Sequence, residues 1–339
     1  MKFGVIGAGT FGSRHIQALD RHPAAELVAV LDLNRELAEK SVAQFATKPV
    51  KVYTDIDEFL AIEGLEAVSV ATPDHLHTAP AVAAARAGKH LLVEKPLATT
   101  VDDAKAIVDA ANASGVTLMV DFHNRVNPPF VDAQKSVSEG VVGDVKYVYA
   151  RLSNTMSIAS GIRWASSSSS LWFLSSHMVD IAQWVVGEKI VSVTARASSG
   201  VLESRGITTP DIFVIMAEFE SGALAVFEHA WILPNGSPTN TDLKFEVLGS
   251  DGAIYVDTTH NRTLEVVTEE KLSFPGVLPM PSSPRLTGFV LDAIAQFVDA
   301  VNGDGPVLAT GEEGLQVTAV LCAILESIES GQPVAVEVP

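Results

Sequence analysis

The first 120 residues alternate short apolar runs with longer segments of helical composition. The runs that we expect to form strands are Phe3–Ile6, Leu27–Leu31, Ala67–Val70, His90–Val93 and Thr117–Val120. The segments that we expect to form helices between them are Phe11–Asp20, Arg35–Phe45, Ile56–Ile62, Ala79–Ala87 and Val101–Ala113. Strand–helix alternation of this kind is typical of a parallel, doubly wound sheet. The pattern therefore predicts an α/β domain at the N-terminal end.

The pattern changes after residue 122, where expected strands follow one another without helices between them. These strands are Val145–Ser153, Ile190–Ala197, Ile212–Glu220, Ala223–Ile232, Leu243–Leu248, Ala253–Val256 and Thr263–Val267. Turn residues around Gly222 and Gly252 favour hairpins, which make neighbouring strands antiparallel. Three helices are expected, at Leu171–Val186, Gly288–Val301 and Glu312–Glu329. We predict a doubly wound domain at 1–122 and an α+β domain with a large, mostly antiparallel sheet at 123–339.

Composition narrows the classes of function. Apolar residues make up 47% of the 339 positions, and the formal net charge is −18. Because so acidic a chain repels phosphate backbones and anionic lipids, nucleic acids and membrane surfaces are poor partners. No apolar run approaches the roughly 18 residues of a membrane-spanning helix. The single cysteine, Cys322, lies in an apolar pattern typical of a buried core, and the lack of a second cysteine favours a cytoplasmic location.

A glycine motif at positions 7–12 follows the first strand and opens the first helix. Gly7 permits a tight turn, Gly9 lets the backbone approach a pyrophosphate, and Gly12 allows the helix to pack closely on the strand. Asp32 lies twenty positions after Gly12, at the end of the second strand. A carboxylate there accepts ribose hydroxyls and repels a 2′-phosphate, so we predict NAD rather than NADP, although Arg35 could tolerate the phosphate. The alternative is a structural turn with a surface aspartate.

A lysine comes directly after another buried strand, in the sequence Glu94-Lys95-Pro96. Open α/β sheets bind their ligands at this carboxyl edge, where a lysine can stabilise a developing alkoxide. The alternative is an ordinary surface lysine. At the end of the neighbouring strand, we expect Thr72-Pro73 to lie beneath a nicotinamide ribose and Asp74 to cap the next helix. For His77, packing or a hydrogen bond at the helix end is favoured over chemistry.

These motifs together resemble the family of glucose–fructose oxidoreductases, inositol dehydrogenases and MocA oxidoreductases, over essentially the whole chain. The matching positions are Gly7–Gly12, Asp32, Thr72-Pro73, His77, Gly88-Lys89-His90, Glu94-Lys95-Pro96, Asn124-Arg125, Pro128, His177, Asp180 and 248–252. The resemblance implies a Rossmann domain and an open-faced sheet domain, with homodimers or homotetramers formed through the sheet. It also implies sugars, cyclitols and related polyols as substrates.

The resemblance also implies roles for individual residues. Lys95 would position or polarise the reacting oxygen, His177 would act as general acid/base, and the bond before Pro96 would be cis. The alternative for His177 is a helix-face histidine bonded to Asp180. The expected cofactor contacts are Gly7, Gly9, Thr10, Phe11, Gly12, Asp32, Arg35, Thr72, Pro73, His77, Glu94 and Lys95. The expected substrate contacts are His123, Asn124, Arg125, Trp164, Trp172, Phe173 and His177.

The chain departs from the family pattern at Phe173, where many members carry an aspartate one helical turn before the histidine. Small glycines that usually precede it are replaced by Ser168 and Ser169, and Trp172 lies beside it. An aromatic ring cannot hold a substrate hydroxyl, but it can stack on the apolar face of a sugar-like or aromatic ring. We therefore expect a catalytic pair, rather than a triad, in a less polar pocket.

Several alternatives stay open at this level. The serine run 166–170 is either a flexible loop or a substrate-proximal segment, and His229 and Trp231 share one face of a strand that lines either the pocket or an interface. The nine histidines form no credible metal-ligand set, so no metal is expected. Three functions remain: an NAD-dependent polyol dehydrogenase, a cofactor-recycling lyase or glycosidase that oxidises its substrate transiently, and a non-catalytic nucleotide sensor.

Overall fold

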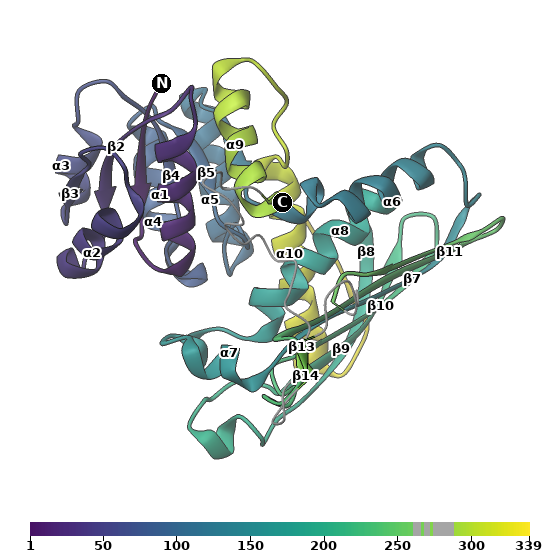
Figure 1. Ribbon diagram of the computed structural model, residues 1–339. Coiled ribbons are helices and arrows are strands. Elements are labelled where there is room, and N and C mark those ends of the chain that lie inside the picture. Colours follow the sequence, from purple (N-terminus) through teal and green to yellow (C-terminus); the bar gives the residue numbers. More distant parts are fainter. Residues whose placement is uncertain (260–265, 268–271, 274–287) are drawn as a thin grey trace. The chain divides into compact units, whose positions relative to one another are not determined.

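The computed structural model describes residues 1–259, 266–267, 272–273 and 288–339, which form two compact units (Figure 1). Unit 1 comprises Met1–Val126 and the described part of 279–318, and unit 2 comprises the described part of 127–278 and Ala319–Pro339. Helix α10 (Gly311–Ser330) therefore runs through both units. Each unit is discontinuous in sequence, whereas the sequence pattern suggests two continuous domains.

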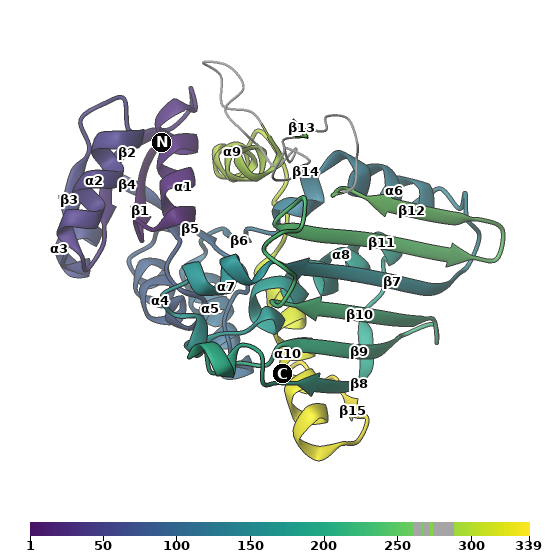
Figure 2. The same cartoon turned by 60° about the horizontal axis from the view of Figure 1, so that its bottom comes forward.

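Unit 1 is built on a six-stranded parallel sheet in the order β3-β2-β1-β4-β5-β6 (Figure 2). Its strands are β1 (Lys2–Ile6), β2 (Glu26–Leu31), β3 (Lys51–Tyr53), β4 (Leu65–Val70), β5 (His90–Val93) and β6 (Leu118–Val120). Its main helices are α1 (Thr10–Arg21), α2 (Arg35–Phe45), α3 (Ile56–Leu60), α4 (Thr78–Arg86), α5 (Val101–Ser114) and α9 (Phe289–Asn302). The predicted doubly wound parallel sheet is confirmed. Strand β3 escapes prediction because it is a three-residue edge strand without a buried residue.

Unit 1 contains helices with side-chain N-caps and a helix, α9, that is distant in sequence from most of the unit. Asn34 caps α2 and Thr100 caps α5, each accepting a backbone N–H of the first turn. Helix α9 contributes Phe297, whose ring meets that of Phe3 edge-on at 6.1 Å between centroids. Both rings are fully buried, so a helix about 290 residues along the chain completes the core beneath β1.

Unit 2 is built on a seven-stranded sheet in the order β12-β11-β7-β10-β9-β8-β15 (Figure 2). Its strands are β7 (Val145–Asn154), β8 (Ile190–Ser198), β9 (Ile212–Phe219), β10 (Leu224–Ala230), β11 (Thr241–Gly249), β12 (Ala253–Asp257) and β15 (Val334–Ala335). All neighbours are antiparallel except β7 and β10. The predicted mostly antiparallel sheet is confirmed. Buried and exposed residues alternate along β9, so the sheet has one covered face and one open face.

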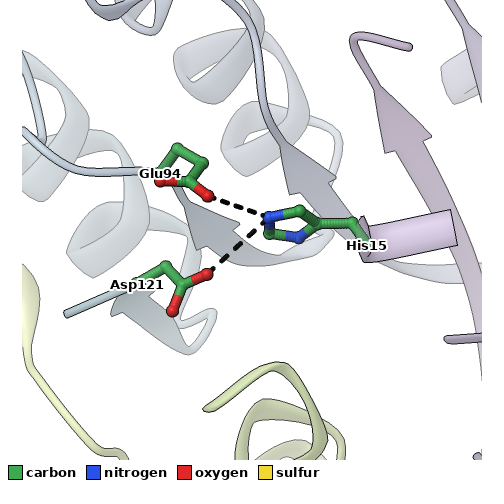
Figure 3. A group of neighbouring side chains, drawn as sticks. All are labelled: His15, Glu94 and Asp121. Carbon is green, nitrogen blue, oxygen red and sulfur yellow. Dashed lines mark hydrogen bonds and ion pairs between the residues drawn. The ribbon is translucent and has the colours of Figure 1, made fainter. Parts of the chain in front are cut away.

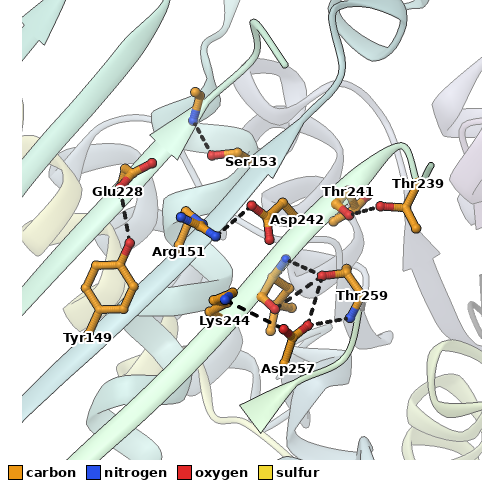
Figure 4. Close-up of polar contacts among 12 residues, drawn as sticks. Tyr149, Arg151, Ser153, Glu228, Thr239, Thr241, Asp242, Lys244, Asp257 and Thr259 are labelled. Atoms are coloured by element: carbon orange, nitrogen blue, oxygen red, sulfur yellow. Dashed lines mark hydrogen bonds and ion pairs between the residues drawn. The ribbon is translucent and has the colours of Figure 1, made fainter. Parts of the chain in front are cut away.

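The open face of this sheet carries polar pairs that link neighbouring strands (Figure 4). Tyr149 donates its hydroxyl proton to Glu228 at 3.1 Å, joining β7 to β10. Arg151 forms an ion pair of 2.8 Å with Asp242, joining β7 to β11. Along β9, the apolar side chain of Met216 is 51% exposed on this face. The face thus combines partly exposed ion pairs with exposed apolar side chains.

Some predicted elements of unit 2 need correction. Two helices were not apparent in the pattern: α6 (Pro128–Ser138), and α7 (Met156–Gly161), which is too short to show a period. The helix expected at Leu171–Val186 is instead a π-helical turn at Leu171–Ser175 followed by α8 (Ser176–Val186). Of the strand expected at 263–267, the described residues form β13 (Val266–Val267), paired with β14 (Leu272–Ser273), and the other three positions lie outside the described residues. Cys322 is half-buried rather than buried.

Candidate functional site

The glycine loop of unit 1 has the geometry that a dinucleotide needs. Gly7 has φ of 98°, which a side chain would strain, and a Cβ on Gly12 would collide with the carbonyl oxygen of Gly7. A Cβ on Gly9, by contrast, would meet no protein atom within 4 Å. Gly7 and Gly12 are therefore required by the fold itself. Gly9 borders open space at the N-terminus of α1, where a bound pyrophosphate would approach the backbone.

Asp32 is held in place at the end of β2. Its Oδ2 accepts the N–H of Ala8 at 2.8 Å, and its Oδ1 accepts the N–H of Asn34 at 2.8 Å. These bonds tie the second strand to the glycine loop and orient the half-buried carboxylate beside it. Arg35 points elsewhere, with its guanidinium 3.6 Å from the carboxylate of Glu39 on the exposed side of α2.

Lys95 is buried at the carboxyl end of β5, with 6% of the residue exposed. Its Nζ lies 5.8 Å from the centre of the Phe11 ring, which places it beside the glycine loop. The peptide bond between Lys95 and Pro96 is cis, as the family resemblance implies. Burial lowers the pKa of Lys95, against the opposing charges of Glu94, Asp74 and Asp121. A buried lysine at this edge is not the surface lysine of the alternative interpretation.

His77 connects two loops at the same sheet edge. Its Nδ1 lies 2.8 Å from the carbonyl oxygen of Pro96, and its Nε2 lies 3.0 Å from that of Thr72. Burial lowers the pKa of His77, against the hydrogen bonds to these two carbonyl oxygens, which favour the protonated ring. The hydroxyl of Thr72 is buried without a hydrogen-bond partner among the described residues, as expected of a group that meets a ligand. Asp74 does not cap α4, which begins behind His77 without a side-chain cap.

Three ionisable side chains that the sequence pattern did not connect meet at the carboxyl edge of this sheet (Figure 3). His15 of α1 places its Nε2 3.1 Å from Glu94 and 3.7 Å from Asp121, and all three residues are buried. The sequence did contain one indication of this contact. His15 comes three residues after Gly12, which places both residues on the side of α1 that faces the sheet. Asp121 also follows directly after β6, at the same carboxyl edge as Lys95.

The turn after β6, η2 (His123–Val126), contains three of the expected substrate residues. His123 packs its ring against Phe289 of α9 at 5.5 Å, and burial lowers its pKa to about 4. Arg125 donates to the carbonyl of Leu308 at 3.1 Å and pairs with Glu313 at 2.7 Å. Arg125 therefore fastens the C-terminal segment to unit 1. This structural use makes it a weaker candidate for substrate binding than the buried Asn124.

The candidate residues of unit 2 include His177, the second residue of α8, of which 8% is exposed. The π-helical turn directly before it presents the half-buried Phe173. The Phe173 ring lies 5.6 Å from that of Trp231 and 6.4 Å from that of Trp164, measured between centroids. We call Trp164, Phe173 and Trp231 the aromatic wall. Helical π turns are frequent at functional sites, so this irregularity marks the segment independently of the motif.

The serine run and Trp172 are packed rather than loose. Ser170 is fully buried, and the carbonyl of Ser168 accepts the hydroxyl of Thr209 at 2.9 Å. Trp172 is 9% exposed, and its carbonyl accepts the hydroxyl of Ser176 at 2.8 Å. The run is thus an ordered support for the π turn. The hydroxyl of Ser170 is buried without a hydrogen-bond partner among the described residues.

His229 and Trp231 both lie on the covered face of the sheet, each with 0% exposed. His229 donates from Nδ1 to the carbonyl of Leu152 at 3.1 Å, and burial lowers its pKa to about 4. Trp231 forms part of the aromatic wall, and its indole N–H is buried without a hydrogen-bond partner among the described residues. Their shared face is therefore the one that carries the His177 segment rather than the open one.

Comparison with known proteins agrees with this architecture. Residues 1–122 match the model of an oxidoreductase family with an NAD-binding Rossmann fold, and residues 134–336 match the C-terminal alpha/beta domain of the same family. The chain belongs to this family. Its recognition from motifs, as well as the prediction of NAD as the cofactor, is confirmed. In the part of the chain that the structure describes, no helix is both long and apolar enough to span a membrane.

Individual relatives are similar along their whole length. The chain is 25% identical to an inositol 2-dehydrogenase of Rhizobium meliloti, covering 99% of both chains. It is 27% identical to an NAD(+)-dependent scyllo-inositol 2-dehydrogenase of Bacillus subtilis, covering 98% of this chain and 96% of the relative. The crystal structure of GenD2 from gentamicin A biosynthesis, in complex with NAD, is 26% identical with a TM-score of 0.85, covering 99% of this chain and 96% of GenD2. The family and these relatives indicate an NAD-binding oxidoreductase.

Proposed function

We propose that the chain is an NAD-dependent dehydrogenase of a secondary alcohol on a cyclic polyol or sugar-like substrate. The observation that carries the proposal is the buried Lys95 at the carboxyl end of β5, beside the glycine loop of an NAD-binding domain. Relatives similar over their full length are inositol dehydrogenases, which supports a ring alcohol as the substrate. When bound, the nicotinamide supplies the hydride acceptor.

Residues of unit 1 would hold the cofactor. The pyrophosphate would lie over Gly9 and the first turn of α1, where the backbone is accessible. Asp32 would accept the ribose hydroxyls with the lone pairs left over from its two backbone bonds, which favours NAD over NADP. The buried hydroxyl of Thr72, which lacks a partner among the described residues, would be satisfied on the nicotinamide side.

Proton transfer would use two side chains, His177 and Lys95. His177 would take the hydroxyl proton as general base, since imidazole titrates near neutral pH. Lys95 would stabilise the developing alkoxide, and its burial strengthens that interaction because the local dielectric is low. With Phe173 in place of a carboxylate, no acidic side chain lies one helical turn before His177.

The aromatic wall would set which ring is accepted. The half-buried Trp164 and Phe173 would present their rings to the substrate, and the fully buried Trp231 would support Phe173 from behind. Trp172 is buried in the support of the π turn. Such a wall favours a substrate with one apolar face, such as a deoxy, O-alkyl or aryl derivative, over a uniformly hydroxylated ring. His123 and Asn124 of η2 would supply polar contacts from unit 1.

The test is a panel of cyclitols, sugars and their deoxy, O-methyl and aryl derivatives, assayed with NAD for formation of the reduced cofactor. Lys95→Met should lower kcat/KM on the best substrate by about a hundredfold or more, because the alkoxide loses its cation. Lys105→Met is the matched control, since Lys105 is exposed and pairs only with Asp109 among the described residues. Equal turnover by both variants would show that the role of Lys95 is wrong.

We also propose that the open face of the unit 2 sheet joins copies of this chain into a homodimer or homotetramer. Its partly exposed pairs, such as Arg151 with Asp242, and exposed side chains, such as Met216 and Tyr255, suit a mixed interface. The molar mass from light scattering should be that of a dimer or tetramer. Met216→Asp should shift this mass toward that of the monomer. A monomeric wild-type chain at micromolar concentration would contradict this proposal.

A further inference from the structure

His15, Glu94 and Asp121 form a closed group of ionisable side chains that the proposed hydride chemistry does not use (Figure 3). Their exposed fractions are 0%, 5% and 0%. They come from three elements: His15 from α1, Glu94 from the end of β5 and Asp121 from the end of β6. The polar atoms of the three side chains lie within 4.8 Å of one another. Ionising both carboxylates would be costly, because their charges repel and both side chains are buried.

Hydrogen bonds decide which of the two carboxylates keeps its charge. Glu94 faces Nε2 of His15 at 3.1 Å with Oε1, and its Oε2 accepts the N–H of Lys95 at 3.1 Å. Neither oxygen of Asp121 has a hydrogen-bond partner among the described residues, although both are buried. A buried carboxylate without donors is far less stable than the corresponding carboxylic acid. Glu94 is therefore the ion and Asp121 the acid.

The ionisation tendencies follow the same geometry. Burial, and then the charge of Glu94, raise the pKa of Asp121 well above its usual range. Burial also raises the pKa of Glu94, but the hydrogen bond and charge of His15, together with Lys95, outweigh this and hold the value at about 2. His15 is fixed at both ring nitrogens, because its Nδ1 lies 2.7 Å from the hydroxyl of Ser69. The imidazole thus stays directed at Glu94.

Other ionisable groups on the surrounding elements do not change this assignment. The groups on α1, on the segment after β5, in η2 and on α9 are Arg14, His15, Asp20, Arg21, Glu94, Lys95, His123, Arg125, Asp292 and Asp299. His123 is neutral near pH 7, with a pKa of about 4. Arg125 pairs with Glu313, Asp292 is exposed, and Asp299 lies 3.7 Å from His22. Lys95 favours an ionised Asp121, but burial and the charge of Glu94 outweigh it. His15 lies 3.7 Å from Asp121, beyond hydrogen-bond distance, and is hydrogen-bonded to Glu94 instead.

We propose that Asp121 is a positioning residue that carries a proton inside the folded chain, so that it adds no negative charge beside the ammonium of Lys95. An ionised Asp121 would add a second negative charge and hold the Lys95 proton more firmly. A neutral Asp121 leaves Lys95 able to exchange its proton with a substrate oxygen. The consequence for Lys95 rests on the proposed function, whereas the proton on Asp121 does not.

The first test is the pH dependence of unfolding of the chain without cofactor or substrate. Because the folded form of Asp121 holds its proton more tightly than the unfolded form, its contribution to stability is complete below about pH 4 and falls as the pH rises from there toward its folded pKa. Asp121→Asn keeps the shape and the neutral charge. Its Tm should therefore exceed that of the wild type by at least about 2–4 °C at pH 8, and the difference should disappear near pH 4.

Asp20→Asn is the matched control, because Asp20 is another buried aspartate of unit 1 but accepts three hydrogen bonds from Thr47 and Lys48. It should lower the Tm at pH 8 rather than raise it. Infrared spectra of the wild type at pH 7 should also contain a carboxylic-acid C=O band that is missing in Asp121→Asn and retained in Asp20→Asn.

Three results would overturn the assignment: parallel Tm curves for wild type and Asp121→Asn, no acid band lost in that variant, or one equivalent of a divalent cation in the purified protein. The cation would mean that Asp121 is an ionised ligand. None of these measurements needs turnover, so a failure of the proposed dehydrogenase function leaves them intact. If that function holds, Asp121→Asn should shift the alkaline limb of the pH–rate profile, whereas Asp20→Asn should leave that limb where it is in the wild type.

Discussion

The candidate residues of the two units have different physical surroundings. In unit 1, Lys95 is buried, and the ionisable residues Glu94, Asp74 and Asp121 act on its charge. In unit 2, His177 follows a π-helical turn that presents aromatic rings. Charge is therefore held in the unit that binds the cofactor, whereas shape and apolar surface lie in the unit that differs from the family pattern at Phe173. This division implies that reaction type and substrate choice can be altered separately.

The strongest test of this division is His177→Gln. Because it removes the proposed general base and leaves the NAD-binding residues of unit 1 unchanged, kcat on the best substrate should fall about a thousandfold while the Kd for NAD stays the same. Calorimetric titration with NAD and steady-state kinetics together measure both quantities. A loss of NAD binding in this variant would mean that the cofactor and proton-transfer functions are not divided between the units.

A buried neutral histidine in each unit makes stability depend on acid. Burial holds the pKa of His123 and of His229 at about 4, below the usual 6.5, so their contribution is complete above pH 6.5 and is lost as the pH falls toward 4. Each loss amounts to about 3 kcal/mol. His229→Asn keeps a hydrogen-bond donor to the carbonyl of Leu152. In denaturant unfolding, the free energy of unfolding of this variant should fall less between pH 6.5 and 4 than that of the wild type. If the free energy of unfolding depends on pH in the same way in both proteins, the acid sensitivity arises from a group other than His229.

Asp32→Ala should change the cofactor rather than the substrate. The variant loses the ribose acceptor and leaves the N–H of Ala8 without its bond, so the Kd for NAD should rise about tenfold to a hundredfold. Because the negative charge is also gone, NADP should bind better than it does to the wild type. Glu36→Ala, an exposed acidic change in the first turn of α2, should leave both affinities as they are.

The smallest expected effect concerns the aromatic wall. Phe173→Asp should move the ratio of kcat/KM values about tenfold toward uniformly hydroxylated rings and away from O-alkyl or aryl derivatives. Phe173→Leu serves as its control, because it keeps the apolar surface but removes the ring that meets Trp231. If the two variants show the same preference, side-chain polarity at this position does not select the substrate.

Much of the fold followed from local pattern. Strands of unit 1 are buried on both faces and so form apolar runs, which made five of six predictable, whereas the exposed edge strand β3 carries no such run. Helix α7 spans only six residues, too few to show a period. The split of the expected helix into a π turn and α8 was also invisible, because both have the same composition and differ only in hydrogen bonding.

The sequence by itself determined the nucleotide motif, the lysine at the strand edge and the missing carboxylate at Phe173, because each depends on residues close together in the chain. Only the tertiary structure decided that Lys95 is buried, that Arg125 is engaged with Glu313, and that Trp231 joins Phe173. It alone brought Asp121 to His15 and Glu94. The reason is physical: protonation and burial depend on which distant segments exclude water together, and no local spacing records that.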